Sequence, residues 1–104
     1  AADFTTPPVA QETRPDGSVV SLVVAGANPF RGTTRLALTL DRPQDVRVEI
    51  VDLLGRTVQT LHDGAMSAET QTLNVSSAGL APGVYVVRAV GEDVVLSERL
   101  TVIR

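Results

Sequence analysis

Cysteine is absent from this 104-residue chain, and several other chemically useful residue types are scarce. Without cysteine the chain can form no disulfide framework and can carry out no thiol chemistry. The single histidine, His62, leaves too few nitrogen and sulfur ligands for a typical transition-metal site. Tryptophan is also absent, and the aromatic residues are Phe4, Phe30 and Tyr85. A surface that binds carbohydrate by stacking sugars on aromatic rings therefore has little to use.

Lysine is missing as well, so all 9 basic residues are arginine, set against 12 acidic residues. The formal net charge is −3 and the arginines form no stripe, which makes nucleic acid a poor candidate partner. No apolar run approaches the ~20 residues that a membrane-spanning helix needs. We therefore expect no nucleic-acid partner and no transmembrane segment.

Apolar and polar residues alternate along much of the chain, as they do in half-buried β-strands. The stretch "RLALTL" places Leu36, Leu38 and Leu40 on one face, and "DVRVEIVD" alternates in the same way from Asp45 to Asp52. Turn-forming residues separate these runs and no stretch has helical periodicity. The pattern predicts strands at 18–25, 35–40, 45–52, 57–61, 70–75, 84–90 and 94–103.

Strands of this length, spaced about 10 residues apart, are typical of an all-β, immunoglobulin-like β-sandwich of about seven antiparallel strands. A chain of this size can also bury a sufficient core without staples. The alternation predicts a buried set comprising Leu36, Leu38, Leu40, Val46, Val48, Ile50, Leu73, Val84, Val86, Leu100 and Val102.

The first 17 residues show no such alternation. They contain Pro7-Pro8, Pro15-Asp16-Gly17 and several threonines, which is typical of a linker. We expect residues 1–17 to be a flexible linker from an upstream domain and residues 18–104 to form the folded domain.

Two glycines and one tyrosine mark expected turns. Gly55 and Gly83 are predicted to adopt positive φ, and Pro82-Gly83 fits the central positions of a type II turn. Tyr85, which begins the strand after this turn, resembles the tyrosine of the corner found in Greek-key sandwiches. Its hydroxyl is then expected to bond to the backbone and its ring to fill the edge of the core.

The sequence offers little evidence of catalysis. His62 and Asp63 form a possible acid–base pair, but a triad needs a third group and a defined geometry, so we interpret His62 as an exposed turn residue. Turn carboxylates at an end of a sandwich could bind calcium, although no EF-hand-like loop is present. We interpret them as solvated and expect neither an enzyme nor a bound metal or cofactor. They are Asp41, Asp45, Glu92 and Asp93.

Four stretches carry a more specific signal when they are considered in order. They are Asn28-Pro29-Phe30; residues 46–61, with Asp52, Gly55 and Arg56; residues 80–89, with Leu80, Gly83 and Tyr85; and residues 97–104, with Arg99, Leu100, Val102 and Arg104. Their order and spacing resemble the type A C-terminal sorting domain of the type IX secretion system of Bacteroidetes. The resemblance covers residues 26–104, and the terminal basic residues of that family, usually lysines, are arginines here.

The resemblance implies a cargo signal rather than an enzyme. Such a domain ends a larger exported protein, which reaches the periplasm by an ordinary N-terminal signal. The outer-membrane translocon and a shuttle protein then recognise the domain, and a sortase-type peptidase removes it at the cell surface. For this chain it implies an upstream cargo domain, and recognition through Gly83, Tyr85, Arg99, Leu100, Val102 and Arg104.

Two other interpretations remain open from the sequence. One is a fibronectin-like or adhesive immunoglobulin-like binding module inside a bacterial surface protein. The other is a structural domain of the kind that caps flagellar hook-scaffold proteins, whose strand ending in D-x-x-G-R is similar. Position in the full-length protein separates them, because a sorting domain must come last.

Overall fold

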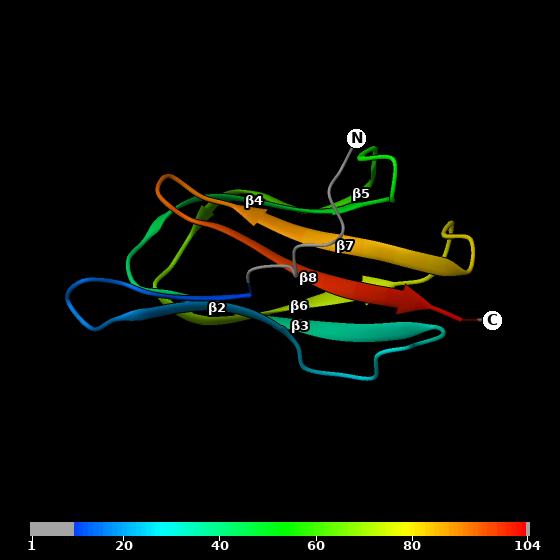
Figure 1. Ribbon diagram of the computed structural model, residues 1–104, viewed down its shortest axis with the longest axis horizontal. Helices are drawn as coiled ribbons and strands as arrows, with labels where there is room; N and C mark the ends of the chain where they lie inside the picture. The colour runs from blue at the N-terminus through cyan, green and yellow to red at the C-terminus, as the bar shows by residue number, and fades with distance from the viewer. Residues whose placement is uncertain (1–9, 104) are drawn as a thin grey trace.

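A computed structural model describes residues 10–103 of the chain, and residues 1–9 and Arg104 lie outside the described part. The described residues form antiparallel strands arranged as two packed sheets, with no helix (Figure 1). The predicted all-β sandwich is therefore confirmed. The strands are β1 (Gln11–Thr13), β2 (Val19–Val24), β3 (Thr33–Leu40), β4 (Gln44–Val51), β5 (Thr57–Met66), β6 (Glu69–Ser76), β7 (Gly83–Val90) and β8 (Val95–Val102).

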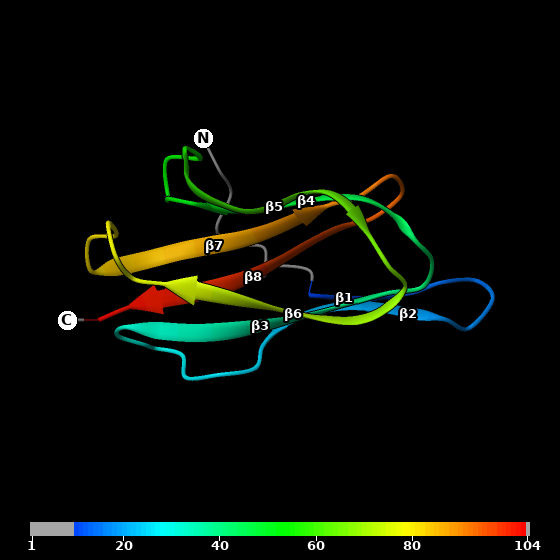
Figure 2. The same ribbon diagram turned by 180° about the vertical axis from the view of Figure 1, so that it is seen from behind.

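The first sheet has the strand order β1-β2-β3-β6 and the second has the order β5-β4-β7-β8. The chain crosses between sheets after β3, after β5 and after β6, so the topology is not a simple meander. Figure 2 shows the same two layers from behind, with β1, β2, β3 and β6 forming the lower one. None of residues 10–103 belongs to a helix long and apolar enough to cross a membrane.

Because successive strands run in opposite directions, the loops alternate between the two ends of the sandwich. We call one the motif end: it holds the loops at 25–32, 52–56 and 77–82, together with the end of β8. We call the other the acidic end: it holds the loops at 14–18, 41–43, 67–68 and 91–94. In Figure 1 the motif end lies on the right, beside the C-terminus.

The core lies between the sheets and follows the predicted alternation on β3, β4 and β8. Leu36, Leu38 and Ile50 are fully buried, as are Val48 and Leu100. At about 25 cal/mol per Å² of apolar surface removed from water, each such side chain contributes roughly 1.5–3 kcal/mol. Leu73 is half-buried and packs against this cluster.

The predicted inward face of β7 is wrong. Tyr85, Val87 and Ala89 point into the core, whereas Val84 is 39% exposed and Val86 is half-buried. The run "VYVVRAV" has apolar residues at both phases of the alternation, but Arg88, its one charged residue, shares a phase with Val84, Val86 and Val90 and marks that phase as the outward one. The hydrogen bond of Tyr85, described below, holds the other phase in the core.

Strand β1 lies within the stretch expected to be a linker. Gln11–Thr13 pair with Val19–Ser21 of β2, and the hairpin is closed by a hydrogen bond from Arg14 N to Ser18 O of 2.8 Å. Residues 10–17 therefore belong to the sandwich rather than to a flexible tether. The linker prediction for residues 1–9 falls outside the described residues.

Strand β5 is longer than its sequence pattern indicates. It continues to Met66 through a bulge between the Val48–His62 and Glu49–Thr60 pairs, although His62-Asp63-Gly64 suggested a loop. His62 is consequently half-buried in a strand and not in an exposed turn. Its Nε2 lies 3.1 Å from the carbonyl oxygen of Gly64.

Candidate functional site

The residues of the four motifs, which are scattered along the sequence, converge on the motif end. The Asn28-Pro29-Phe30 segment runs along the outer edge of β8, the last strand. Phe30 N donates to Thr101 O at 3.0 Å, and Ile103 N donates to Phe30 O at 2.8 Å. These bonds form a short parallel bridge between Phe30 and Val102, and the Phe30 ring is buried in the core.

The Asn28 side chain extends this pairing in the manner of a backbone peptide. Its Nδ2 donates to Arg99 O at 3.1 Å, and its Oδ1 accepts from Thr101 N at 3.0 Å. A carboxamide carries one donor and one acceptor side by side, as a peptide group does. Asn28 and Phe30 together therefore satisfy four outward backbone groups at the end of β8, from the carbonyl of Arg99 to the N–H of Ile103.

The loop before this segment is held against β3. Thr34 is buried, and its hydroxyl donates to Ala27 O at 2.7 Å. Gly26 lies so close that a Cβ placed on it would be 2.5 Å from Thr34 Oγ1. Only glycine fits at position 26 without displacing Thr34. Through its bond to Ala27 O, Thr34 in turn holds the residue that leads into the Asn28-Pro29-Phe30 segment.

The Asp52–Arg56 turn joins β4 to β5, and local bonding and backbone conformation account for the aspartate, glycine and arginine of its motif. Asp52 Oδ1 accepts from Leu54 N at 2.9 Å and from Arg56 N at 3.0 Å, while Oδ2 accepts from Arg56 Nε at 2.9 Å. Gly55 has a φ of +83°, as predicted. The backbone N–H of Arg56, with the other donors, holds the pKa of Asp52 below its usual range.

The corner before β7 behaves as a tyrosine corner. Tyr85 is 8% exposed, and its hydroxyl donates to Ala81 O, four residues upstream. A hydrogen bond from Leu80 N to Ser77 O closes a turn over residues 77–80, in which Gly79 has a φ of +81°. This turn lies just before the one predicted at Pro82-Gly83. Gly83 begins β7 with φ +154°, so its predicted positive φ is confirmed.

The terminal strand divides its residues between core and surface as the alternation predicts. Leu100 and Val102 are buried, whereas Arg99 and Ile103 are exposed and Thr101 is half-buried. Arg104, another expected recognition residue, lies outside the described residues. Most of the motif is thus used to build the motif end, because Phe30, Tyr85, Leu100 and Val102 lie in the core.

Sequence reasoning missed exposed apolar residues at this end. Leu53 is 46% and Leu54 is 77% exposed at the tip of the Asp52–Arg56 turn. The dipeptide Leu53-Leu54 inside a tight turn was the available signal, since turn tips are usually polar.

A carboxylate is buried on the outer face of the second sheet. Glu49 is 4% exposed and accepts a hydrogen bond from Arg88 Nη2, from the neighbouring β7. Thr57 Oγ1 and Arg47 Nε lie 3.2 and 3.1 Å from Glu49 Oε2. The Arg88 bond, reinforced by these neighbours, holds the pKa of Glu49 below its usual range.

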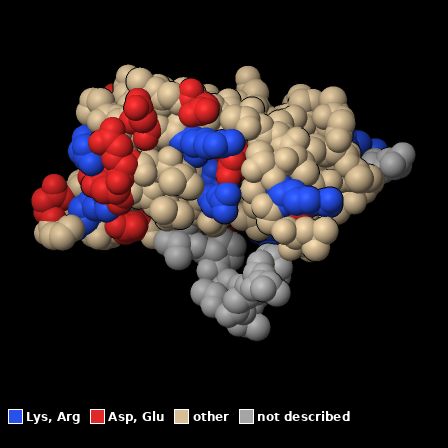
Figure 3. Space-filling view, turned by 90° about the horizontal axis from the view of Figure 1, so that it is seen from above, with Lys and Arg blue, Asp and Glu red and all other residues tan. Residues whose placement is uncertain are grey.

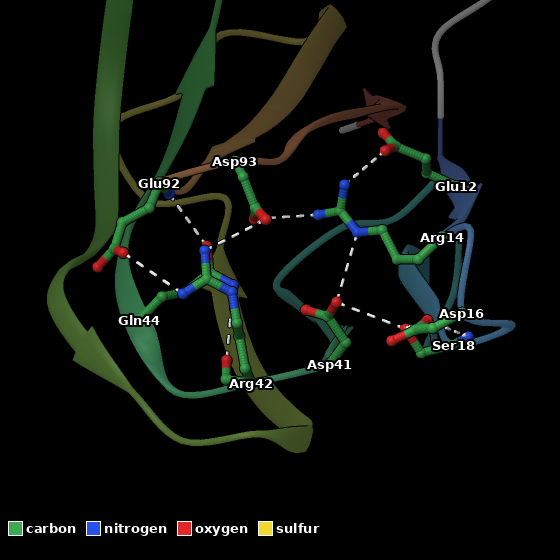
Figure 4. A network of polar contacts seen from close by, with 9 residues as sticks. All are labelled: Glu12, Arg14, Asp16, Ser18, Asp41, Arg42, Gln44, Glu92 and Asp93. Carbon is green, nitrogen blue, oxygen red and sulfur yellow. Dashed lines mark hydrogen bonds and ion pairs between the residues drawn. The ribbon is translucent and has the colours of Figure 1, made fainter.

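The acidic end is organised by two arginines (Figure 4). Arg14 Nη1 contacts Glu12 at 2.6 Å, Nε lies 3.4 Å from Asp41, and Nη2 contacts Asp93 at 3.1 Å. Arg42 reaches Asp93 at 3.2 Å, and this bond raises the pKa of Arg42.

The turn carboxylates of this end are therefore partly used in ion pairs. Asp41 has a side-chain exposure of 12%, which corrects its interpretation as solvated, whereas Glu92 and Asp93 remain about half exposed at 52% and 47%. Among residues 10–103, no group of three or more acidic or histidine side chains is placed to hold a metal ion.

The match to known families agrees with this geometry. The profile of the secretion system C-terminal sorting domain matches residues 28–103, from the asparagine that bridges β8 to the end of that strand. The chain belongs to this family. The sorting domain is a type IX secretion signal, and the family is one of signals rather than enzymes. A search of curated proteins finds no match to the sequence.

Family membership also gives the destination. A sorting domain of this family directs its protein through the type IX system to the cell surface. All the motif residues that can be located lie at the motif end, and the family match begins and ends there.

Proposed function

We propose that this domain is the C-terminal signal by which the type IX translocon, with its shuttle protein, selects a cargo protein in the periplasm and passes it across the outer membrane. The observation that carries the proposal is the convergence of the family motifs on one end of a sandwich. That end includes the end of β8, and the motif residues that form it lie within the matched range 28–103.

The motif residues serve this function by fixing the terminal strand. β8 pairs with β7 over its whole length on one side and with Asn28 and Phe30 on the other. A receptor therefore meets a strand whose outward side chains Arg99, Thr101 and Ile103 have defined positions. Gly83, Tyr85, Leu100 and Val102 contribute by shaping the end rather than by direct contact.

After passage, a sortase-type peptidase at the cell surface separates the cargo from the domain. The β1–β2 hairpin is tied to the sandwich by Arg14, which contacts acidic residues from β1 and from two other loops. A cut that leaves the domain intact then falls on the N-terminal side of β1. The cargo is an upstream domain of the same chain.

A reporter export assay tests the proposal. The domain is fused behind a periplasm-targeted reporter in a host with the type IX machinery, and in a matched host that lacks the translocon. We expect the reporter to appear outside the cells of the first host and not outside those of the second. A reporter that stays in the periplasm of the competent host contradicts the function.

The alternative of a binding module makes a different prediction in the same assay. An adhesive immunoglobulin-like domain has no reason to move the reporter, wherever it is placed in the fusion. A sorting domain acts only at the C-terminus, so adding a folded domain after Arg104 is expected to stop export.

A further inference from the structure

The outer face of the second sheet carries an apolar surface at the motif end. The register of β7 and β8 places Val84 beside Thr101 and Val86 beside Arg99, all with outward side chains. Val84 is 39% and Ile103 is 41% exposed. We call the outward side chains of Val84, Val86, Arg99, Thr101 and Ile103 the β7–β8 face.

A row of charged residues limits this face on the side of the acidic end. The register places Arg88 beside Ser97 on β8 and beside Glu49 on β4, and Arg88 bonds to Glu49. Beyond this row, Val90 and Val95 are again exposed, at 38% and 56%. Strand β7 therefore has two exposed valines of equal accessibility, Val84 and Val90, on opposite sides of the charged row.

The edge of β8 is closed to strand addition over the terminal residues. A partner that added a strand would need the outward backbone groups of Arg99, Thr101 and Ile103. Asn28 and Phe30 already bond to Arg99 O, Thr101 N, Thr101 O and Ile103 N. The N–H of Arg99 faces the carboxylate of Glu98 at 3.1 Å. What a receptor can reach at this end is thus the side-chain face and not the edge.

The charges are distributed unequally between the two ends. Figure 3, which looks onto one face, shows acidic side chains gathered at one end of the molecule. By the strand topology, Glu12, Asp16, Asp41, Asp45, Glu69, Glu92 and Asp93 all lie at the acidic end. Arg31 and Arg99 lie at the motif end and form no ion pair with another residue in the range 10–103. A partner with an acidic rim is attracted to the motif end and repelled from the other.

We propose that the β7–β8 face is the docking surface for a protein of the secretion machinery that presents an apolar patch with an acidic rim. The inference rests on the proposed function and specifies where recognition takes place. Val84, Val86 and Ile103 supply the apolar contact, and Arg99 pairs with the acidic rim. Asn28 positions β8 and prevents strand addition, so the receptor recognises a face of the sheet.

Two matched substitutions on one strand test the position of the surface. Val84→Glu and Val90→Glu change the same residue type at 39% and 38% exposure, on the same outer face of β7. In the reporter fusion, we expect Val84→Glu to lower export by about tenfold or more, as for a central interface residue. Val90→Glu is expected to stay within about twofold of wild type, as for an ordinary surface change. Urea denaturation of the purified domains checks that both variants unfold at similar midpoints.

A third variant separates docking on the face from strand addition. The N–H of Ser97 points away from β7 because outward groups alternate along the strand. Ser97→Pro removes this donor, which lies on the part of the edge not covered by Asn28, and proline is tolerated on edge strands. We expect Ser97→Pro to be exported normally. Lost export in Ser97→Pro with normal export in Val84→Glu overturns the proposal in favour of strand addition.

The remaining outcomes are equally decisive. If wild type is exported and Val84→Glu is exported as well, the docking surface is wrong while the sorting function stands. An equal loss of export in Val84→Glu and Val90→Glu also overturns the proposed docking surface, because recognition is then not confined to the motif end. If the wild-type domain is a dimer in solution that Val84→Glu makes monomeric, the face pairs with a second copy. If the reporter fused to the wild-type domain stays in the periplasm, both the proposed sorting function and the proposed docking surface are wrong.

Discussion

At the scale of single residues, Asp52 shows how one carboxylate can define a turn. Its oxygens accept two backbone N–H groups and one guanidinium N–H within five residues, with Arg56 contributing to both oxygens. These bonds need no partner from elsewhere in the chain, so the turn can be recognised from sequence. They also explain why aspartate, glycine and arginine occur at fixed spacing in the motif.

Substitutions at Asp52 are expected to separate the contributions of its two oxygens. Asp52→Asn keeps an oxygen for the N–H groups of Leu54 and Arg56 but loses the charge that Arg56 Nε contacts. Asp52→Ala loses both, so we expect its thermal midpoint to fall further than that of Asp52→Asn. A differential scanning calorimetry series of the three proteins measures the order, and the same midpoint for both variants contradicts this account.

Gly55 is predicted to be replaced more easily by asparagine than by valine. Its φ of +83° is strained for a β-branched residue, whereas asparagine tolerates the left-handed region. No atom lies within 4 Å of a Cβ at this position, so backbone strain is the only cost. We expect Gly55→Val to cost about 1–3 kcal/mol and Gly55→Asn clearly less, measured by urea unfolding.

Glu49 is expected to make stability sensitive to acid. Its pKa is lowered in the folded state, so its contribution is present above the unfolded value and is lost as the pH falls through the folded one. Stability differences between wild type and Glu49→Gln should therefore be largest near pH 7 and shrink below about pH 4. Asp63→Asn, an exposed change on β5, is the control, and a constant difference between wild type and Glu49→Gln contradicts the prediction.

At the scale of elements, β1 illustrates pairing that is too short to predict. Gln11–Thr13 has no apolar alternation, and its place is fixed by β2 and by the ion pairs of Arg14. Three residues seldom carry a readable pattern, and proline and glycine beside them indicate a turn whether or not a strand precedes it.

Limited proteolysis tests whether β1 is held in solution. We expect a protected fragment that begins near residue 10 in the wild-type protein, and not near Ser18. Arg14→Ala removes contacts to Glu12, Asp41 and Asp93, so its fragment should begin nearer Ser18. Mass spectrometry of the stable fragments gives both positions. A wild-type fragment that begins at Ser18 would show that β1 contributes little to the fold.

At the scale of the whole molecule, β8 completes the sandwich and belongs to the candidate recognition site. Leu96, Leu100 and Val102 lie in the core, and β8 also supplies the backbone groups that Asn28 and Phe30 bind. Loss of recognition and loss of folding are therefore inseparable in any deletion of this strand.

Removing residues 95–104 is accordingly expected to abolish cooperative folding. Each of the buried side chains lost contributes roughly 1.5–3 kcal/mol, which together is comparable to the whole stability of a domain of this size. Circular dichroism and thermal melting of the truncated chain measure this directly. A truncated chain that still melts cooperatively would show that the first seven strands form a sufficient core.

What the sequence by itself determined is the local part of the structure. Alternation identified β3 and β4, because period two reflects burial of one face of a strand. Apolar and β-branched runs between turn residues identified β2 and β6 to β8. The Asp52–Arg56 turn followed from bonds within five residues. The order of the motifs was enough to indicate the family that the profile match then established.

The tertiary structure alone decided which distant segments meet. Arg88 marks the outward phase of "VYVVRAV" already in the sequence, and the Tyr85–Ala81 and Arg88–Glu49 bonds hold that phase in the fold. The contact of Asn28 with Arg99 and Thr101 spans more than 70 residues. Such pairing depends on the course of the chain through both sheets. No local pattern encodes that course, because a strand's alternation specifies a buried face but not the neighbour along its edge.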